Sequence, residues 1–321
     1  MSSRECRPDV LIIGAPKAGT TALHAALARH PSVYASPVKE PKYYMCADAP
    51  PPAYAGPGDA HSQREWVWRR EDYAELFASA PAGALRLEST PFYLYLSAAR
   101  RRIAEELPDA RLLVVIRDPI DRAYSNWMHL WVDGLEPNGD FVAAWNAEDQ
   151  RVAAGWAPFW HYQRLGRYGE QLADLFSRVD RERVLVLRYW QLVSEPAETL
   201  NRVARFLGLA EDKIGTVPPD NSRPFVRPGL KASVLGRVIR GGAAAGQLFP
   251  PQVWRQASRP LVAALQQGGL RRRPRLAPEQ RAELLADCQD DIARLEEVLG
   301  QSFEDWRSVT GRGSFAERAV S

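Results

Sequence analysis

The chain has 321 residues, of which 45% are hydrophobic and 25% charged, and its 42 Lys and Arg against 39 Asp and Glu give a formal net charge of +3. These ordinary globular values exclude disorder, collagen and coiled coil as the main architecture. The small charge excess argues against a nucleic-acid-binding protein. At roughly 150 residues per domain the chain has room for about two domains, although one large α/β domain also fits.

Three cysteines, Cys6, Cys46 and Cys288, form neither a disulfide framework nor a CxxC metal site, which favours a reducing compartment. The apolar run before Gly14 has only four residues, too short for a signal-peptide core or a membrane span. We therefore expect a soluble, cytoplasmic protein without stable membrane insertion. The histidines show no HExxH or comparable ligand pair, so no metal site is predicted.

The first elements in chain order are a strand, a turn and a helix. Val10 to Ile13 is a continuous apolar run, typical of a strand buried on both faces of a parallel sheet. A glycine-containing turn from Gly14 to Thr21 follows, and then an Ala- and Leu-rich helix from Ala22 to Arg29. Val33 to Ala35 is a second short strand. Residues 46 to 65 are rich in Pro, Ala and Gly, which predicts a loop or lid.

Strands and helices alternate through the rest of the chain. The predicted elements are a helix over 71–79, a strand over 85–87, a helix over 98–107, a strand over 112–116, a helix opened by Pro119, a helix over 165–178, a strand over 184–187, a helix over 197–207 ended by Gly208, and a helix over 276–299. Residues 214–277 are rich in Pro, Gly and Arg. The pattern predicts an α/β fold with a central parallel sheet flanked by helices, in one domain over 1–321 with loop or lid insertions near 46–70 and 214–277.

The segment from Gly14 to Thr21 has the features of a phosphate-binding loop. A strand, a glycine turn and a helix direct backbone N–H groups and the helix N-terminus at one spot, where a phosphate binds. Gly14 and Gly19 have the Walker A spacing, but the lysine comes earlier in the loop, at Lys17. The loop therefore retains the backbone arrangement that binds a phosphate, but its lysine lies between the two glycines and not after the second one. The alternative is a tight turn with an exposed lysine.

A second candidate begins at Arg117, directly after the strongest predicted strand. Open α/β sheets bind ligands at the carboxyl ends of their strands. Ser125 lies about two helical turns further on. An arginine and a hydroxyl there would hold a second phosphate, the arginine through a charge-assisted fork. The alternative is a surface arginine that pairs with Asp118 or Asp121.

Together these segments resemble a known family. Pro16-Lys17-Ala18-Gly19-Thr20-Thr21-Ala22-Leu23 resembles the 5′-phosphosulfate loop of sulfotransferases that use 3′-phosphoadenosine 5′-phosphosulfate (PAPS). Arg117-Asp118-Pro119-x-x-Arg122-Ala123-Tyr124-Ser125 resembles their 3′-phosphate motif. The similar branch is that of the heparan-sulfate and bacterial enzymes. Supporting matches follow in order at Lys39–Tyr44, Glu88–Tyr93, Gly166–Leu172 and Ile292–Gly300 with Trp306.

The resemblance implies a P-loop-NTPase-like sulfotransferase fold and in-line transfer of a sulfuryl group from PAPS to an acceptor hydroxyl or amine. The product nucleotide is 3′-phosphoadenosine 5′-phosphate (PAP), and no metal is required. Lys17 would neutralise charge on the bridging oxygen of the leaving phosphate, so that positioning and charge stabilisation dominate. The residues expected to form the 5′-phosphate loop around it are Pro16, Ala18, Gly19, Thr20 and Thr21.

The 3′-phosphate is expected to contact Arg117 and Ser125, and it is the group that separates PAPS from ATP. Arg223 and Arg227 fall where the family has a loop that closes over the nucleotide, so both are expected phosphate contacts.

Three residues are candidates for the general base or for acceptor contact. Glu40 is preferred, because a glutamate in this segment faces the acceptor in the resembling branch. Glu88 is its rival, and the family often has Glu-Lys-[Ser/Thr]-Pro where this chain has Ser89 in place of the lysine. His129 lies one helical turn beyond Ser125 and is the third candidate. The sequence leaves the choice among them open.

Two other functions remain as alternatives. A P-loop small-molecule kinase would use ATP and Mg²⁺, and it predicts a lysine at position 20, where this chain has Thr20. A non-catalytic nucleotide-binding protein is the other. For the sulfotransferase, the expected partner is a small-molecule, glycolipid or glycan acceptor, in a bacterium with a GC-rich genome. The sequence leaves the oligomeric state open, a homodimer included.

Overall fold

The computed structural model describes residues 7–57, 65–214, 226–227, 229–245, 251–266 and 276–309. Within them the chain forms a five-stranded sheet in the order β2-β3-β1-β4-β5, and every neighbouring pair is parallel. The strands are β1 (Val10–Gly14), β2 (Val33–Ala35), β3 (Leu85–Ser89), β4 (Arg111–Ile116) and β5 (Val184–Arg188). The predicted parallel sheet is therefore confirmed.

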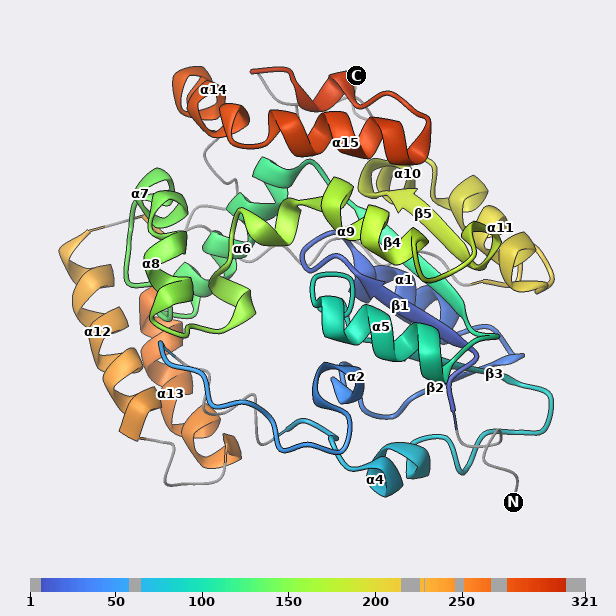
Figure 1. The fold of residues 1–321 in the computed structure, drawn as a ribbon. Helices are drawn as coiled ribbons and strands as arrows, with labels where there is room; N and C mark the ends of the chain where they lie inside the picture. The colour runs from blue at the N-terminus through green and yellow to red at the C-terminus, as the bar shows by residue number, and fades with distance from the viewer. Residues whose placement is uncertain are drawn as a thin grey trace.

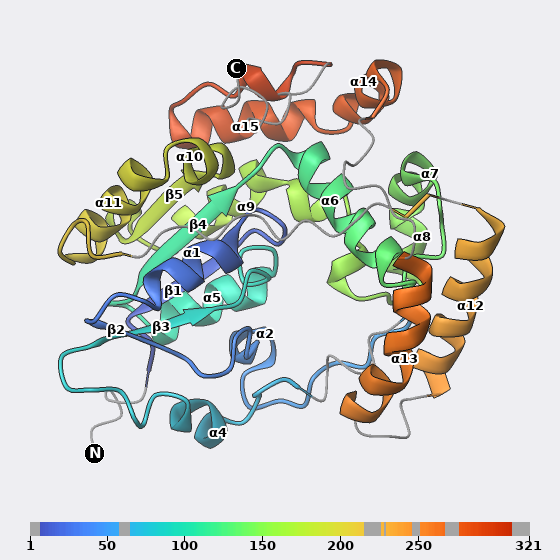
Figure 2. The same ribbon diagram turned by 180° about the vertical axis from the view of Figure 1, so that it is seen from behind.

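Helices cover both faces of this sheet. Helices α1 and α11 lie on one face and α5 and α9 on the other (Figures 1 and 2). The chain moves outward from β1 in opposite directions on its two sides, so right-handed crossovers place the connecting helices on opposite faces. The helices are α1 (Thr20–Leu27), α2 (Tyr43–Cys46), α4 (Arg70–Glu75), α5 (Ser97–Glu106), α6 (Pro119–Val132), α7 (Phe141–Asn146), α8 (Glu148–Ala153), α9 (Tyr168–Phe176), α10 (Tyr189–Ser194), α11 (Pro196–Leu207), α12 (Leu230–Ala245), α13 (Pro251–Gln266), α14 (Pro278–Ala286) and α15 (Gln289–Leu299).

The core is centred on β1 and β4, the strands that precede the two predicted phosphate motifs. Every residue of β1 is buried, and so is every residue of β4 except Arg111. Helix α6 follows β4 and begins as predicted, with Pro119 in its first turn. The Asp118 side chain caps this helix by accepting from the N–H groups of Ile120 and Asp121. The two motifs are thus anchored on the most enclosed part of the sheet.

The carboxyl-terminal part of the chain differs from the sequence prediction. Residues 276–299 form two helices, α14 and α15, because the helical pattern breaks at Asp287 and Cys288. Residues 214–277, expected to be an insertion of loop character, contain the helices α12 and α13, which pair with each other. Helix α15 packs on α9 where Gly169 allows a close approach, since a Cβ there would lie 2.4 Å from the carbonyl oxygen of Asp291.

Candidate active site

The candidate residues gather at one edge of the sheet. The loop with Lys17 follows β1, Arg117 follows β4, and Ser89 is the last residue of β3. Glu40 lies beyond β2, and its N–H donates to the carbonyl oxygen of Ser89 at 3.0 Å. Because all strands are parallel, their carboxyl ends meet at this edge, which is where open α/β sheets bind ligands.

The loop between β1 and α1 has a fixed path. The N–H of Ala15 donates to Val115 O at 2.7 Å, which ties the loop to β4, and the N–H of Ala18 donates back to Ala15 O at 3.2 Å. Lys17 and Gly19 have positive φ values of 66° and 93°. A Cβ at Gly19 would lie 3.0 Å from the Tyr189 ring, so a side chain here would require the ring to shift by a few tenths of an ångström. Helix α1 begins at the next residue, and its first N–H groups have no partners within the helix.

Arg117 joins the two motifs, although they lie one hundred residues apart. Its Nη1 donates to the carbonyl oxygen of Lys17 at 3.4 Å, and its guanidinium lies 4.6 Å from the centre of the Tyr189 ring. Tyr189, the first residue after β5, therefore touches both Arg117 and the Gly19 position. Tyr189 was not among the predicted site residues, and its one signal in the sequence was an aromatic residue two positions after the predicted strand over 184–187.

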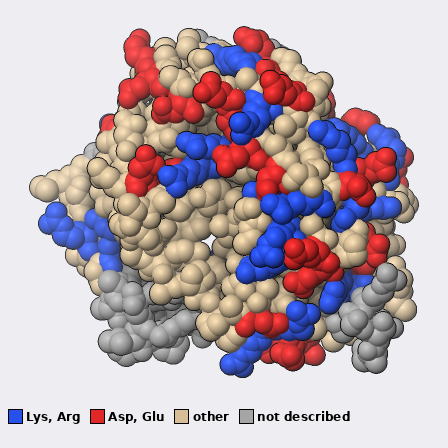
Figure 3. Space-filling view, viewed as in Figure 1, with Lys and Arg blue, Asp and Glu red and all other residues tan. Residues whose placement is uncertain are grey.

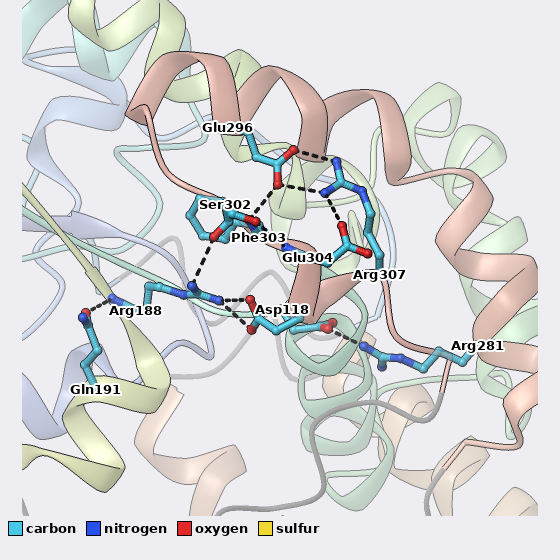
Figure 4. A network of polar contacts seen from close by, with 10 residues as sticks. Asp118, Arg188, Gln191, Arg281, Glu296, Ser302, Phe303, Glu304 and Arg307 are labelled. Atoms are coloured by element: carbon cyan, nitrogen blue, oxygen red, sulfur yellow. Dashed lines mark hydrogen bonds and ion pairs between the residues drawn. The ribbon is translucent and has the colours of Figure 1, made fainter.

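The alternative in which Arg117 pairs with Asp118 or Asp121 does not describe this site. Arg281 of α14 forms ion pairs with both carboxylates, the one to Asp121 at 2.9 Å. Figure 4 shows the pair of Arg281 and Asp118 at the start of α6. The guanidinium of Arg281 therefore satisfies these acids, and Arg117 stacks on Tyr189 instead.

The carboxyl-terminal segment is fastened to the same edge of the sheet by further polar contacts (Figure 4). Arg188, the last residue of β5, pairs with Asp305 at 2.6 Å. Arg281 also donates to Ser308 O at 2.9 Å, and Arg307 binds Glu296 at 2.8 Å. Arg281 and Arg188 thus connect residues 276–309 to the starts of α6 and α10. These contacts hold the starts of both helices in place next to the candidate site.

Glu40 lies at the rim of this edge. Its carboxylate pairs with the neighbouring Lys39 at 2.8 Å, and the two side chains are 29% and 34% exposed. Glu40 also has a positive φ of 58°. The carboxylate is therefore accessible to an acceptor and has a lysine beside it.

A histidine and a serine that the sequence analysis did not combine meet beside Glu40. Nδ1 of His24 lies 2.7 Å from the Oγ of Ser89. Burial lowers the pKa of His24, Lys39 lowers it further, and Glu40 opposes them. His24 lies one helical turn after Thr20, so it shares a face of α1 with the end of the phosphate loop. That i, i+4 spacing was the only signal in the sequence.

The two rivals of Glu40 lie in different surroundings. The Glu88 carboxylate is fully buried and accepts hydrogen bonds from the hydroxyls of Tyr73 at 2.8 Å and Tyr93 at 3.1 Å. Burial raises the pKa of Glu88 to about 7. His129 pairs with Asp133 at 3.7 Å and contacts the Phe159 ring. Glu88 is therefore enclosed, whereas the His129 side chain is 29% exposed, as Glu40 is, and is paired with an acid of its own helix.

The other predicted phosphate contacts have varied positions. Ser125 is buried on α6, and Thr20 is buried at the start of α1. Arg227 is exposed, whereas Arg223 lies outside the described residues. Arg122 of the second motif belongs to the core: it is fully buried, donates to Tyr162 O at 2.6 Å, and burial lowers its pKa.

Known proteins share sequence similarity with this chain. Human heparan sulfate glucosamine 3-O-sulfotransferase 6 is 30% identical over 204 residues, which are 63% of this chain and 52% of that protein. The corresponding enzyme 3B1 of Mus musculus is 29% identical over 63% of this chain and 46% of its own length. The chain thus spans about half the length of these relatives.

A solved structure extends the similarity beyond the sheet. The crystal structure of a sulfotransferase from Alicyclobacillus acidocaldarius aligns over 94% of this chain and 99% of its own, with a TM-score of 0.71 and 26% identity. The family model described as the sulfotransferase family matches residues 8–213, well over half of the sequence. The chain therefore belongs to the sulfotransferase family.

Proposed function

We propose that this chain transfers the sulfuryl group of PAPS to a hydroxyl of an acceptor. The observation that supports this most strongly is the contact between the two motifs, in which Arg117 donates to the backbone of Lys17. One cation lies within the loop that follows β1, and a second follows β4 beside it. A donor with a phosphosulfate at one end and a separate phosphate on its ribose needs this pair of cations.

Each residue of the loop has a role in this proposal. Gly19 lets the loop pack closely against the ring of Tyr189. The backbone of the loop would there approach a phosphate. The N–H groups at the start of α1, with Thr20 and Thr21, would hold the 5′-phosphate, and Pro16 and Ala18 shape the loop. Lys17 would neutralise the charge that develops on the oxygen between phosphorus and sulfur.

Arg117 and Ser125 would hold the 3′-phosphate, the guanidinium by a fork and the hydroxyl by a single bond. Arg227, which is exposed, is proposed as a further phosphate contact. Arg223 is proposed for the same role and falls outside the described part of the chain. Tyr189 contributes by holding the Arg117 guanidinium in place.

Glu40 would act as the general base. In the transfer, a bond forms between the acceptor oxygen and sulfur while the bond between sulfur and the bridging oxygen breaks. The proton of the acceptor hydroxyl goes to the Glu40 carboxylate, which is partly exposed at the rim. Lys39 pairs with that carboxylate at 2.8 Å and positions it at the rim. Glu88 is enclosed and bound by two tyrosines, so it is a support for the end of β3 in this proposal.

The acceptor is proposed only as a class. The relatives in the comparison are named for heparan sulfate, so a glycan or a small molecule with a free hydroxyl is the acceptor that the similarity supports. We also propose a cytoplasmic, bacterial enzyme. The two cysteines within the described residues, Cys46 and Cys288, are both unpaired and buried, which supports a reducing compartment.

The experiment offers the protein two labelled donors in parallel. PAPS with a radiolabelled sulfuryl group, and ATP labelled on its terminal phosphate with Mg²⁺, are each incubated with a panel of hydroxylated acceptors. The proposal predicts transfer of label from PAPS alone. Transfer from ATP alone would favour the small-molecule kinase, and binding of PAP without any transfer across the panel would favour a non-catalytic nucleotide-binding protein.

A further inference from the structure

Helix α12 carries apolar residues on its outer face as well as its inner one. Its inner face packs with Ala232 and Ile239, which are both buried. On the outer face Leu230, Val234 and Val238 are 83%, 50% and 52% exposed, and their spacing of four residues aligns them in one stripe. A helix on the surface of a soluble protein is ordinarily polar on its outer side. The stripe is therefore an exposed apolar surface, and its transfer out of water would be favourable.

The stripe lies in a strongly basic part of the chain. Between Asp220 and Glu279 the sequence has eleven Lys and Arg and no Asp or Glu, which leaves 31 basic against 39 acidic residues in the rest of the chain. Arg237 on α12 and Arg259 on α13 are both exposed. In Figure 3 the left-hand lobe, where Figure 1 places α12, shows blue and tan atoms without red ones. The net charge of +3 is thus the sum of one basic region and an otherwise acidic chain.

These two properties together select one kind of partner. An anionic polysaccharide would use the exposed arginines but would leave the aliphatic stripe in water. The surface of an anionic lipid bilayer uses both, because aliphatic side chains enter the interface while Lys and Arg meet the lipid phosphates. We propose that α12 and α13 dock the protein on an anionic membrane surface. No helix among the described residues is long and apolar enough to cross a bilayer, so the contact is peripheral.

The docking helices are attached to the candidate site through α6. Arg240 of α12 donates to Gly134 O at 3.0 Å and to Glu136 O at 3.2 Å, just beyond the end of α6. Trp131 of α6 donates its indole N–H to Val226 O at 2.9 Å. Helix α6 begins beside Arg117, so a membrane that holds α12 also sets the orientation of the site. If the proposed function holds, acceptor hydroxyls carried by membrane lipids would be within its class of substrates.

Sedimentation with lipid vesicles tests the docking without any need for catalysis. The full chain is mixed with vesicles of phosphatidylcholine, alone or with phosphatidylglycerol, and the bound fraction is measured against lipid concentration and salt. We expect binding only with phosphatidylglycerol, weakening as salt rises. The triple variant Leu230→Gln, Val234→Gln, Val238→Gln should lower the partition coefficient by about tenfold or more. Arg237→Gln with Arg259→Gln should lower it by a similar factor.

Matched controls separate the surface from general damage. Val193→Gln changes an aliphatic residue that is 46% exposed on α10, and it should leave vesicle binding unchanged. The affinity of each variant for PAP reports that the fold and nucleotide site are intact, so failure of the docking and of the proposed function are distinguishable. Absence of binding to phosphatidylglycerol vesicles would overturn the proposal. Unchanged vesicle binding by the triple variant would also overturn it. If that variant likewise kept full binding to heparin, the basic region would be assigned to an anionic polysaccharide instead.

Discussion

The Arg117 guanidinium lies over the ring of Tyr189, 4.6 Å from its centre, while its Nη1 reaches the backbone oxygen of Lys17. A cation over an aromatic face gains about 0.5–1 kcal/mol at an exposed site and keeps its full charge. The carboxylates of Asp118 and Asp121, which would have neutralised that charge, are paired with Arg281. Arg117 is thus positioned and still charged for an anion.

Arg117→Ala should reduce the affinity for PAP by about 10- to 100-fold, the value of a charge-assisted contact of roughly 1.5–3 kcal/mol. The affinity for adenosine 5′-phosphate, which lacks the 3′-phosphate, should change little. Calorimetric titration with both nucleotides measures the difference. Arg178→Ala removes an exposed arginine that pairs with Asp174 and is the matched control. An equal loss for both nucleotides would show that Arg117 supports the fold of the site instead.

Gly19→Ala should abolish most PAP binding, because the added methyl group would lie 3.0 Å from the Tyr189 ring and φ is 93°. Gly83→Ala is a matched control, since φ there is 79° but no atom lies within 4 Å of the new methyl group. The control should lose about 1 kcal/mol of stability from backbone strain and keep its affinity for PAP. If Gly83→Ala weakened PAP binding as much as Gly19→Ala, the contact with Tyr189 would not be the cause.

Much of the fold was predictable because its signals are local. Several segments could be predicted from their own residues alone. They are the apolar strands β1 and β4, the glycine loop between β1 and α1, and the start of α6 at Pro119. The end of α11 at Gly208, with φ of 69°, is another such signal. The parallel direction of the strands follows from their alternation with helices, whereas their order was seen only in the structure.

The partners of the site residues were not predictable, because they come from distant segments. Tyr189 reaches Arg117 only when β5 lies beside β4, and Arg281 reaches Asp118 from α14. His24 and Ser89 are 65 residues apart and meet because α1 passes the end of β3. Composition suggested loops in 214–277, yet the Ala- and Val-rich parts form α12 and α13, where packing outweighs the Gly content.

The contact between His24 and Ser89 leads to a prediction about turnover. Ser89→Ala and His24→Leu should each lower kcat for sulfuryl transfer by about tenfold, the value of one hydrogen bond near the reacting group, with PAP affinity unchanged. His24→Asn, which retains a polar atom near Nδ1, should recover more activity than His24→Gln. Ser177→Ala, an exposed hydroxyl at the end of α9, is the control. Wild-type kcat in His24→Leu would show that the contact between His24 and Ser89 does not contribute to turnover.

Glu88 should make stability depend on pH. Its pKa is about 7 in the folded protein, against 4.5 for an ordinary glutamate, and burial is the main cause. The unfolded chain therefore binds fewer protons than the folded one between these values, so stability falls as pH rises from about 4.5 to about 7, by up to roughly 3 kcal/mol. Glu88→Gln should flatten this slope in urea unfolding at several pH values, and Glu105→Gln, an exposed carboxylate, should not. An unchanged slope in Glu88→Gln would assign the effect to another group.

The most direct test of the account measures Lys17→Ala by two readouts on one preparation, namely transfer of label from PAPS and the Kd for PAP. In the proposed function, Lys17 stabilises the charge that develops during transfer, whereas Gly19, Arg117 and the start of α1 would bind the nucleotide. The account predicts that kcat falls by about a hundredfold or more while the Kd changes by less than about threefold. Wild-type turnover in Lys17→Ala would contradict it.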